Sequence, residues 1–348
     1  MNKHELESIA QALVPEGKGI LAADESFGTI KKRFDSVNVV STEETRRSYR
    51  EMLFTTPGVE EFISGVILFD ETIRQATQDG TPFPEVLAGK GIIPGIKVDK
   101  GAKDLASFPG EKITEGLDGL RERLVEYGDL GARFTKWRAV ITIGEGIPTR
   151  YCIDANAHAL ARFAALSQEA GLVPIVEPEV LMEGDHSIQR CEELTTATLK
   201  SVFSELQEHR VVLEGMLLKP NMVLPGKACP KQASVGEVAE ATVHCLRRVV
   251  PAAVPGIVFL SGGQSPEQAT RHLNAMNAMG EQPWELSFSY GRALQGPSLR
   301  AWKGKASNVA MAQKLFYHRA ECNGAARYGR YSEEMEARAA PSALKPTL

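Results

Sequence analysis

The stretch V-V-L-E-G-M-L-L-K-P-N-M, residues 211–222, reads as a buried β-strand that ends on a lysine. The apolar run has strand length, and Pro220 bars the preceding Lys219 from helical backbone angles. Lys219 is therefore expected at the tip of a strand, where an apolar wall disfavours its charged form and lowers its pKa. Such a lysine is a nucleophilic amine near neutral pH, as Schiff-base chemistry requires. The ordinary alternative is a lysine that extends into solvent at a strand end.

Seven further apolar runs of strand length accompany this one, mostly about 30 to 45 residues apart, and most alternate with segments of helical periodicity. They are residues 19–24, 63–70, 92–99, 132–140, 172–179, 256–263 and 284–292. Continuous apolar runs are typical of parallel strands that are covered on both faces. Eight such units predict an α/β fold, a single (β/α)8 TIM barrel, with a doubly wound sheet as the alternative.

Three details complete the predicted domain. Apolar residues at helical spacing between residues 6 and 13 indicate an extra helix before the first strand. Capping boxes predict helix starts at Ser41 with Glu44 and at Ser234 with Glu237, and Ser265 followed by Pro266 predicts a third. The barrel domain is expected over residues 1–325, and residues 326–348, rich in Ala, Arg, Glu and Pro, are expected to form a flexible tail.

Composition narrows the class of protein. The chain has 348 residues and a formal net charge of −4, which argues against a nucleic-acid-binding protein. Its five cysteines are widely spaced, as in proteins of a reducing compartment. No apolar run reaches transmembrane length and the N-terminus does not resemble a signal peptide, so we expect a cytoplasmic protein that binds no membrane. The seven histidines form no close pair and no H-E-x-x-H motif, so neither a metal nor another cofactor is predicted.

Charged side chains stand at the ends of most predicted strands. Lys136 and Arg138 are two residues apart, as are Glu177 and Glu179, so each pair shares one face of its strand. In a barrel these residues converge with Lys219 on the rim that carries the chemistry. Neighbouring lysines lower each other's pKa, and the carboxylates supply acid and base groups. The alternative is a set of caps and surface ion pairs.

Three loops have features of anion sites. The S-G-G run at residues 261–263 and the S-Y-G-R run at 289–292 follow the last two strands, where barrels often bind phosphate. A third run, D-E-S-F-G-T-I-K-K-R at residues 24–33, follows the first strand and is alternatively a solvated basic loop. Together with the rim lysines, these loops predict carbonyl chemistry on a phosphorylated substrate.

The chain resembles class I fructose-1,6-bisphosphate aldolases from the entry helix to about Tyr331. The motifs that carry the resemblance are L-A-A-D-E-S, G-V-I-L-F, G-I-K-V-D-K-G, K-W-R, P-I-V-E-P-E, L-L-K-P-N-M, L-S-G-G-Q-S and F-S-Y-G-R-A-L. The resemblance implies reversible, metal-free cleavage of fructose 1,6-bisphosphate to dihydroxyacetone phosphate and glyceraldehyde 3-phosphate, in glycolysis, gluconeogenesis or the Calvin cycle. It also implies a homo-oligomer, commonly a tetramer.

The resemblance also implies roles for individual residues. Lys219 would form the Schiff base at C2, Glu177 would transfer protons to and from the intermediates, and Asp24 would take the C4 hydroxyl proton. Lys136 and Glu179 would tune and position Lys219, while Lys97 and Arg138 would hold substrate hydroxyls or phosphate. The groups at the C1 phosphate would be Ser261, Gly262, Gly263, Gly291 and Arg292. Ser289 and Tyr290 are further predicted substrate-binding residues. The groups at the C6 phosphate would be Ser26, Thr29 and Arg33.

Two departures from the family pattern stand out. Phe27 is bulkier than the residue that the family usually has between Ser26 and Gly28, and the chain lacks the frequent terminal tyrosine. Two other functions stay open at this point: another Schiff-base aldolase or transaldolase in the same barrel, and a catalytically idle scaffold that binds sugar phosphates.

Overall fold

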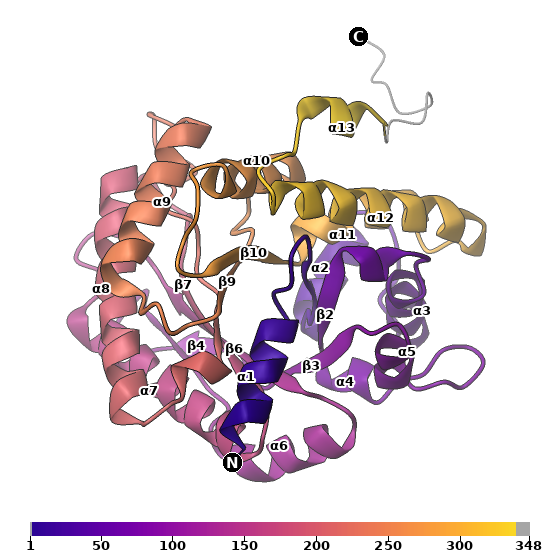
Figure 1. Cartoon of the computed structure of the whole chain (residues 1–348), viewed down its shortest axis with the longest axis horizontal. Coiled ribbons are helices and arrows are strands. Elements are labelled where there is room, and N and C mark those ends of the chain that lie inside the picture. Colours follow the sequence, from indigo (N-terminus) through magenta and orange to yellow (C-terminus); the bar gives the residue numbers. More distant parts are fainter. Residues whose placement is uncertain (1, 339–348) are drawn as a thin grey trace.

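The computed structural model, which describes residues 2–338, contains a closed barrel of eight parallel strands surrounded by helices (Figure 1). The strands follow one another around the barrel in the order β1, β10, β9, β8, β7, β6, β3, β2. The predicted (β/α)8 barrel is therefore confirmed. Its strands are β1 (Gly19–Ala23), β2 (Ile63–Leu68), β3 (Ile93–Lys97), β6 (Phe134–Ile141), β7 (Val173–Val180), β8 (Leu217–Leu218), β9 (Gly256–Phe259) and β10 (Glu285–Tyr290).

Helices cover the outside of the barrel, and a short antiparallel hairpin extends from it. The hairpin consists of β4 (Ala102–Asp104) and β5 (Lys112–Thr114). The helices are α1 (Lys3–Ala12), α2 (Phe27–Asp35), α3 (Glu43–Phe54), α4 (Asp70–Ile73), α5 (Phe83–Gly89), α6 (Leu120–Asp129), α7 (Arg150–Glu169), α8 (Ile188–Glu208), α9 (Val235–Val249), α10 (Pro266–Asn277), α11 (Arg292–Trp302), α12 (Val309–Ala326) and α13 (Glu333–Arg338). Short 3-10 turns occupy Val59–Glu61, Leu213–Gly215 and Ala306–Asn308.

The predicted entry helix is α1, which lies across the barrel in Figure 1. Its apolar face, with Leu6 and Ala10, packs in one buried cluster with inward-facing strand residues such as Phe134 and Val258. Because this packing occupies the N-terminal end of the strands, the barrel opens only at the opposite end within residues 2–338.

The strand around Lys219 is much shorter than predicted. Only Leu217–Leu218 pair as β8, and Leu213–Gly215 form a 3-10 turn instead. The side-chain amide of Gln168 accounts for the difference, since it binds the Val212 and Gly215 carbonyls and accepts from the Val212 N–H. These contacts satisfy backbone groups that a longer strand would have paired with its neighbours. The Lys219 N–H still donates to the Val176 carbonyl at 2.8 Å, so the lysine remains in register with β7.

Helix starts were predicted correctly at two of three capping motifs. Ser234 and Glu237 form the expected box, and Ser265 caps the helix that begins at Pro266. The box predicted at Ser41 is wrong, because Thr42 is the N-cap of α3 and Thr45 completes the box. Threonine makes the same reciprocal contacts as serine, so the one-residue shift keeps the motif's chemistry.

The predicted boundary between barrel and tail, at residues 325 and 326, falls inside α12. The segment that follows contains α13, which is tied to α12 through Glu336: this carboxylate accepts from Tyr331 Oη at 2.7 Å and pairs with Arg319. Residues 339–348 of the expected tail lie outside the described residues. In the part of the chain that the structure describes, no helix has the length and apolar character needed to cross a membrane.

Folding also brings together two histidines that are distant in the sequence. His158 on α7 and His209 at the end of α8 have ring centroids 4.9 Å apart. Spacing along the chain did not reveal this contact, because the packing of the two helices brings the rings together.

Candidate active site

The charged strand ends meet around one cavity of about 1050 Å³ at the C-terminal mouth of the barrel. Sixteen of the seventeen predicted site residues line it: Asp24, Ser26, Thr29, Arg33, Lys97, Lys136, Arg138, Glu177, Glu179, Lys219, Ser261, Gly262, Gly263, Ser289, Gly291 and Arg292. Tyr290 does not line it, because its ring is buried behind β10 and its hydroxyl donates to the Ala269 carbonyl at 3.0 Å. Adjacent strand residues point to opposite faces, so Ser289 and Tyr290 cannot both face the cavity.

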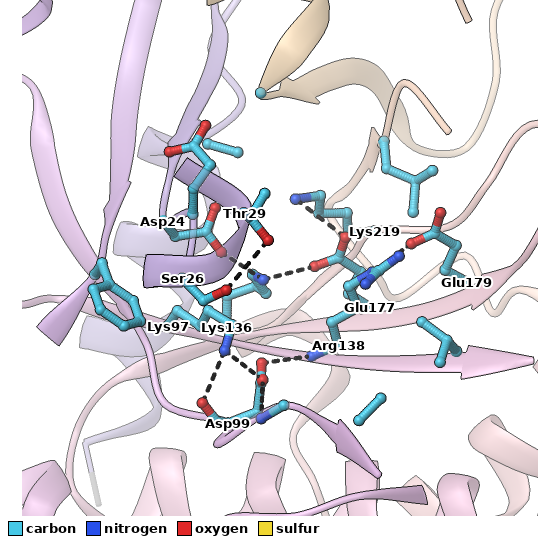
Figure 2. Close-up of a pocket in the computed structure, with 18 of the residues that line it drawn as sticks. Asp24, Ser26, Thr29, Lys97, Asp99, Lys136, Arg138, Glu177, Glu179 and Lys219 are labelled. Atoms are coloured by element: carbon cyan, nitrogen blue, oxygen red, sulfur yellow. Dashed lines mark hydrogen bonds and ion pairs between the residues drawn. The ribbon is translucent and has the colours of Figure 1, made fainter. Parts of the chain in front are cut away.

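Lys219 is 3% exposed and lies beside Glu177, with 3.3 Å between its Nζ and the Glu177 Oε1 (Figure 2). Burial lowers the pKa of Lys219, and the nearby positive charge of Lys136 lowers it further, whereas Glu177 and Asp24 oppose the shift. The net pKa of Lys219 is lowered, as the sequence predicted. The amine is therefore more readily available as a nucleophile than an ordinary lysine.

Lys136 behaves in the opposite way. Its Nζ lies 2.6 Å from Asp24 Oδ2 and 3.2 Å from Glu177 Oε2 (Figure 2). Burial disfavours its charge, but the two carboxylates outweigh burial and raise the pKa of Lys136. The prediction that both lysines have lowered pKa values is wrong for Lys136, because the sequence did not show that it sits between two acids.

Asp24 is held in its ionised form. Burial would raise its pKa, but the charges of Lys136, Lys219 and Lys97 lower the pKa of Asp24 far below its usual value. Asp24 follows β1 while Lys136 belongs to β6, so the pair spans the barrel mouth. The carboxylate is thus a base that faces the cavity.

Glu177 lies between the two lysines. Its Oε2 is within ion-pair distance of Lys136, yet it has no aligned hydrogen bond within residues 2–338. The register of β6 and β7 sets this position, because Arg138 pairs with Glu177 and Lys136 with Ile175. One carboxylate oxygen is therefore close to Lys219 and the other retains capacity to accept a proton.

Asp99 is a site residue that the sequence analysis missed. Its side chain pairs with Lys97 at 2.5 Å and accepts from the Arg138 N–H at 3.1 Å (Figure 2). Arg138 in turn pairs with Glu179 at 2.5 Å. The sequence could have indicated Asp99 through its spacing, because it stands two residues after Lys97 and therefore lies on the same strand face.

The predicted C1 phosphate groups form a concave loop with positive charge around it. Gly262 and Gly263 have φ angles of 56° and 88°, which only glycine adopts readily. A Cβ on Gly263 would lie 2.8 Å from Lys227 Nζ and 3.1 Å from Arg292 Nη2, so both cations approach this loop. Lys227, which currently pairs with Glu183 at 2.9 Å, was missed because it lies on a loop beyond the strand tip.

The predicted C6 phosphate groups lie at the N-terminus of α2. Ser26 is the N-cap, but its side chain makes no capping bond and its Oγ lies 3.2 Å from Thr29 Oγ1. Free N–H groups at a helix start attract anions. Phe27 points outward instead, where its ring contacts Phe69 edge-on and lies under the Arg46 guanidinium. The unusual phenylalanine thus packs beside the loop without lining the cavity.

Arg33 is positioned by a buried acid. Glu25 pairs with both Arg33 and Arg50 and accepts from the Gln295 amide at 2.9 Å. Burial would raise the pKa of Glu25, but the two arginines lower it. The Arg33 guanidinium also comes within 3.5 Å of where a Gly291 Cβ would stand, so it lies between the two predicted phosphate loops.

Comparisons with known proteins point to one family. The family model described as "Fructose-bisphosphate aldolase class-I" matches residues 5–345. A "Probable fructose-bisphosphate aldolase class 1" of Xanthomonas campestris is 61% identical, covering 95% of this chain and 99% of its own. "Fructose-bisphosphate aldolase 5, cytosolic" of Arabidopsis thaliana is 56% identical over 94% of this chain and 92% of its own. A solved fructose-bisphosphate aldolase of Plasmodium falciparum superposes with a TM-score of 0.93 at 52% identity, covering 94% of this chain and 95% of that one.

Proposed function

The chain belongs to the class I fructose-bisphosphate aldolase family, and from that premise we propose which residues carry each step of the reaction. The reaction is the reversible cleavage of fructose 1,6-bisphosphate through a lysine Schiff base. The observation that carries the residue assignment is the contact between buried Lys219 and Glu177, at 3.3 Å. Lys219 is the nucleophile, and its neighbours supply the charges and protons that follow.

Formation of the imine requires two proton transfers. The neutral Lys219 amine attacks the C2 carbonyl to give a carbinolamine, and loss of its hydroxyl as water leaves a protonated imine. Glu177 is close enough to Lys219 to take the proton that the attacking amine releases and to pass it to the departing hydroxyl. After it takes up a proton from water, the same carboxyl group can protonate C3. Lys136 remains charged beside Glu177, with 3.2 Å between Lys136 Nζ and Glu177 Oε2.

Cleavage of the C3–C4 bond requires a base at the C4 hydroxyl. Asp24 removes this proton, the new C4 carbonyl leaves with glyceraldehyde 3-phosphate, and the bonding electrons move into an enamine at C3. The protonated imine accepts these electrons, so no external electron sink is needed. Protonation of C3 and hydrolysis of the imine then release dihydroxyacetone phosphate and restore the Lys219 amine.

Two anion sites on the mouth, one after β9 and β10 and the other after the neighbouring β1, favour a bisphosphate over a monophosphorylated substrate. Ser261, Gly262, Gly263, Gly291 and Arg292 are proposed for the C1 phosphate, with Lys227 as an added cation. Ser26 and Thr29 at the start of α2 are proposed for the C6 phosphate, and Arg33 lies within reach of both. An idle scaffold is not favoured, because the nucleophile Lys219 lies 3.3 Å from Glu177 and the ionised Asp24 lines the same cavity.

Replacing Arg292 by alanine is expected to raise KM for both fructose 1,6-bisphosphate and fructose 1-phosphate about 10- to 100-fold. The change removes a charge-assisted contact to the phosphate that both substrates share, worth about 1.5 to 3 kcal/mol. Lys227→Met should act on the same two substrates, but more weakly because its ammonium is partly solvated. Steady-state kinetics measures both; an Arg292 variant that loses only the bisphosphate would contradict this assignment.

Removing Thr29 and Ser26 hydroxyls together, by alanine substitution, is expected to raise KM for the bisphosphate several-fold and to leave fructose 1-phosphate unchanged. The reason is that only the bisphosphate carries a C6 phosphate at the α2 N-terminus. Comparing the two substrates in the double variant measures the effect. Equal losses on both would show that these hydroxyls stabilise the loop and do not bind phosphate.

Prolonged treatment with EDTA is expected to leave the cleavage rate unchanged. The protonated imine accepts the electrons of the C3–C4 bond, so no metal ion is needed to stabilise them. The test is the turnover rate before and after chelation and dialysis. A loss of activity that added zinc restores would contradict the proposed mechanism.

We also propose that the protein acts in the cytoplasm as a homotetramer. The first part is supported by relatives named as cytosolic, and the second by the resemblance to the family. Light scattering during size-exclusion chromatography would measure the assembly, and a monomer at micromolar concentration would contradict it.

A further inference from the structure

Helices α7 and α8 pack beside each other on the outside of the barrel (Figure 1). Two histidines and a glutamate from these helices converge there. His158 comes from α7, while Glu205 and His209 come from the last turn and cap of α8. None of the three lines the active-site cavity. We propose that they bind one divalent transition-metal ion of the zinc class, at a site separate from the catalytic one.

The spacing of the ligand atoms fits such an ion. One ligand atom from each residue lies within 4.8 Å of the others. Within this limit, Glu205 Oε2 lies 2.9 Å from His158 Nδ1, and the His209 ring adjoins the same carboxylate, with its Nδ1, which is not the nitrogen proposed to bind the ion, 3.6 Å away. Tetrahedral zinc with bonds of about 2.0 to 2.1 Å separates its ligand atoms by roughly 3.3 Å. The 4.8 Å limit is therefore close to the ligand spacing of a bound ion.

The hydrogen bonds favour the protonation state that a metal needs. His209 Nδ1 lies 2.8 Å from the Glu205 carbonyl oxygen, which can only accept, so Nδ1 carries the proton and Nε2 keeps its lone pair. A metal-bound histidine commonly donates its other N–H to a backbone carbonyl in this way. Glu205 and His209 are four residues apart, which places both side chains on one helix face.

The types of ligand atom and their exposure to solvent favour a zinc-type ion. Two imidazoles and one carboxylate are a zinc-type ligand set that leaves a fourth position to water or another ligand. The exposed fractions of the three side chains are 53%, 30% and 21%, so an ion can reach them from solvent. The neighbouring surface carries Glu122 and Arg162, and an Arg121–Glu169 ion pair at 2.6 Å, so opposite charges balance around the site.

A second group with suitable residues, His318, Cys322 and Glu336, is the weaker candidate. Glu336 is already engaged by Arg319 and by Tyr331, whose hydroxyl is 2.7 Å away. Burial raises the pKa of the Cys322 thiol to about 12, which disfavours the thiolate that a metal requires. A metal there would have to displace an arginine, whereas the site between α7 and α8 holds no such competitor within the described residues.

The test uses the full-length protein, without an affinity tag, after chelation and dialysis. Isothermal titration with Zn²⁺ should show one site per chain, and Zn²⁺ should raise Tm. His158→Gln and His209→Gln should each weaken binding at least about tenfold and remove the Tm shift. His244→Gln is the matched control, because His244 makes a similar exposed contact, at 2.6 Å, with Glu192 and should leave binding unchanged.

Three results would overturn the proposal. They are the absence of saturable binding, unchanged affinity in both the His158 and His209 variants, and loss of binding in Cys322→Ala with retention in His158→Gln. The Tm values of the metal-free variants report whether each variant folds, and Glu205→Gln provides a third substitution should one of them unfold. Because the cleavage rate is expected to withstand chelation, this outcome is independent of the proposed catalytic mechanism.

Discussion

Borohydride added in the presence of dihydroxyacetone phosphate is expected to reduce one imine per chain, on Lys219, and to abolish activity. The expectation rests on a buried amine whose pKa is lowered mainly by its burial. Peptide mapping by mass spectrometry locates the modified lysine. Modification of Lys136 instead would contradict the mechanism, since the pKa of that lysine is raised by its two acidic neighbours and it should remain protonated.

Two variants and a pH series sharpen this result. Lys219→Met should lower kcat at least about 10⁴-fold, as loss of a covalent nucleophile does elsewhere, and should give no labelled peptide. The trapping rate in the wild type should rise with pH, because only the neutral amine attacks, with a midpoint below the ordinary lysine pKa of 10.5. In Lys136→Met this midpoint should move upward, because the charge of Lys136 helps to lower the pKa of Lys219.

Asp24→Asn is expected to slow cleavage of fructose 1,6-bisphosphate by about 10² to 10⁴-fold, the usual contribution of a general base. Trapping of dihydroxyacetone phosphate on Lys219 should stay within a few-fold of wild type, because this substrate has no C4 hydroxyl to deprotonate. Kinetics and trapping on the same preparation separate the two steps. A variant that loses both equally would show that Asp24 serves imine formation and not bond cleavage.

Asp70→Asn provides the matched control for that experiment. Asp70 also follows a barrel strand, but its carboxylate pairs with Arg74 at 3.0 Å and accepts from the Tyr127 hydroxyl at 2.9 Å. Its replacement should leave cleavage within a few-fold of wild type. Comparable losses in both variants would indicate that the result reflects general damage to the barrel mouth.

Strand positions and the convergence of charges were predictable because both depend on local pattern. The run at residues 172–179 is apolar up to Val176 and carries acids at 177 and 179, so its burial and its rim position follow from the sequence alone. The length of β8 was not predictable, because it depends on Gln168, which is distant in the sequence and binds the backbone around Val212. Strand length here is a property of tertiary contacts.

The pKa shifts and ion pairs of the site were harder to predict for the same reason. The raised pKa of Lys136 depends on its distances to Asp24 and Glu177, which belong to different strands. The fixed position of Arg33 depends on its ion pair with Glu25. No role was predicted for Glu25, because the prediction for this loop rested on its anion-binding residues. The proximity of His158 to His209 likewise depends on the contact between α7 and α8. Each of these features depends on residues that come together only in the fold, so hydrophobic periodicity cannot predict it.

The ion pairs between Asp24, Lys136, Glu177 and Lys219 have a mechanical consequence. β1 and β7 lie on opposite sides of the closed barrel, and Lys136 links the carboxylates that these two strands carry. These ion pairs link the two strands across the open end of the barrel and so restrain the distance between them. A substrate that engages Lys219 or Asp24 replaces some of these contacts with its own, so we expect the link across the mouth to be weakest while substrate is bound.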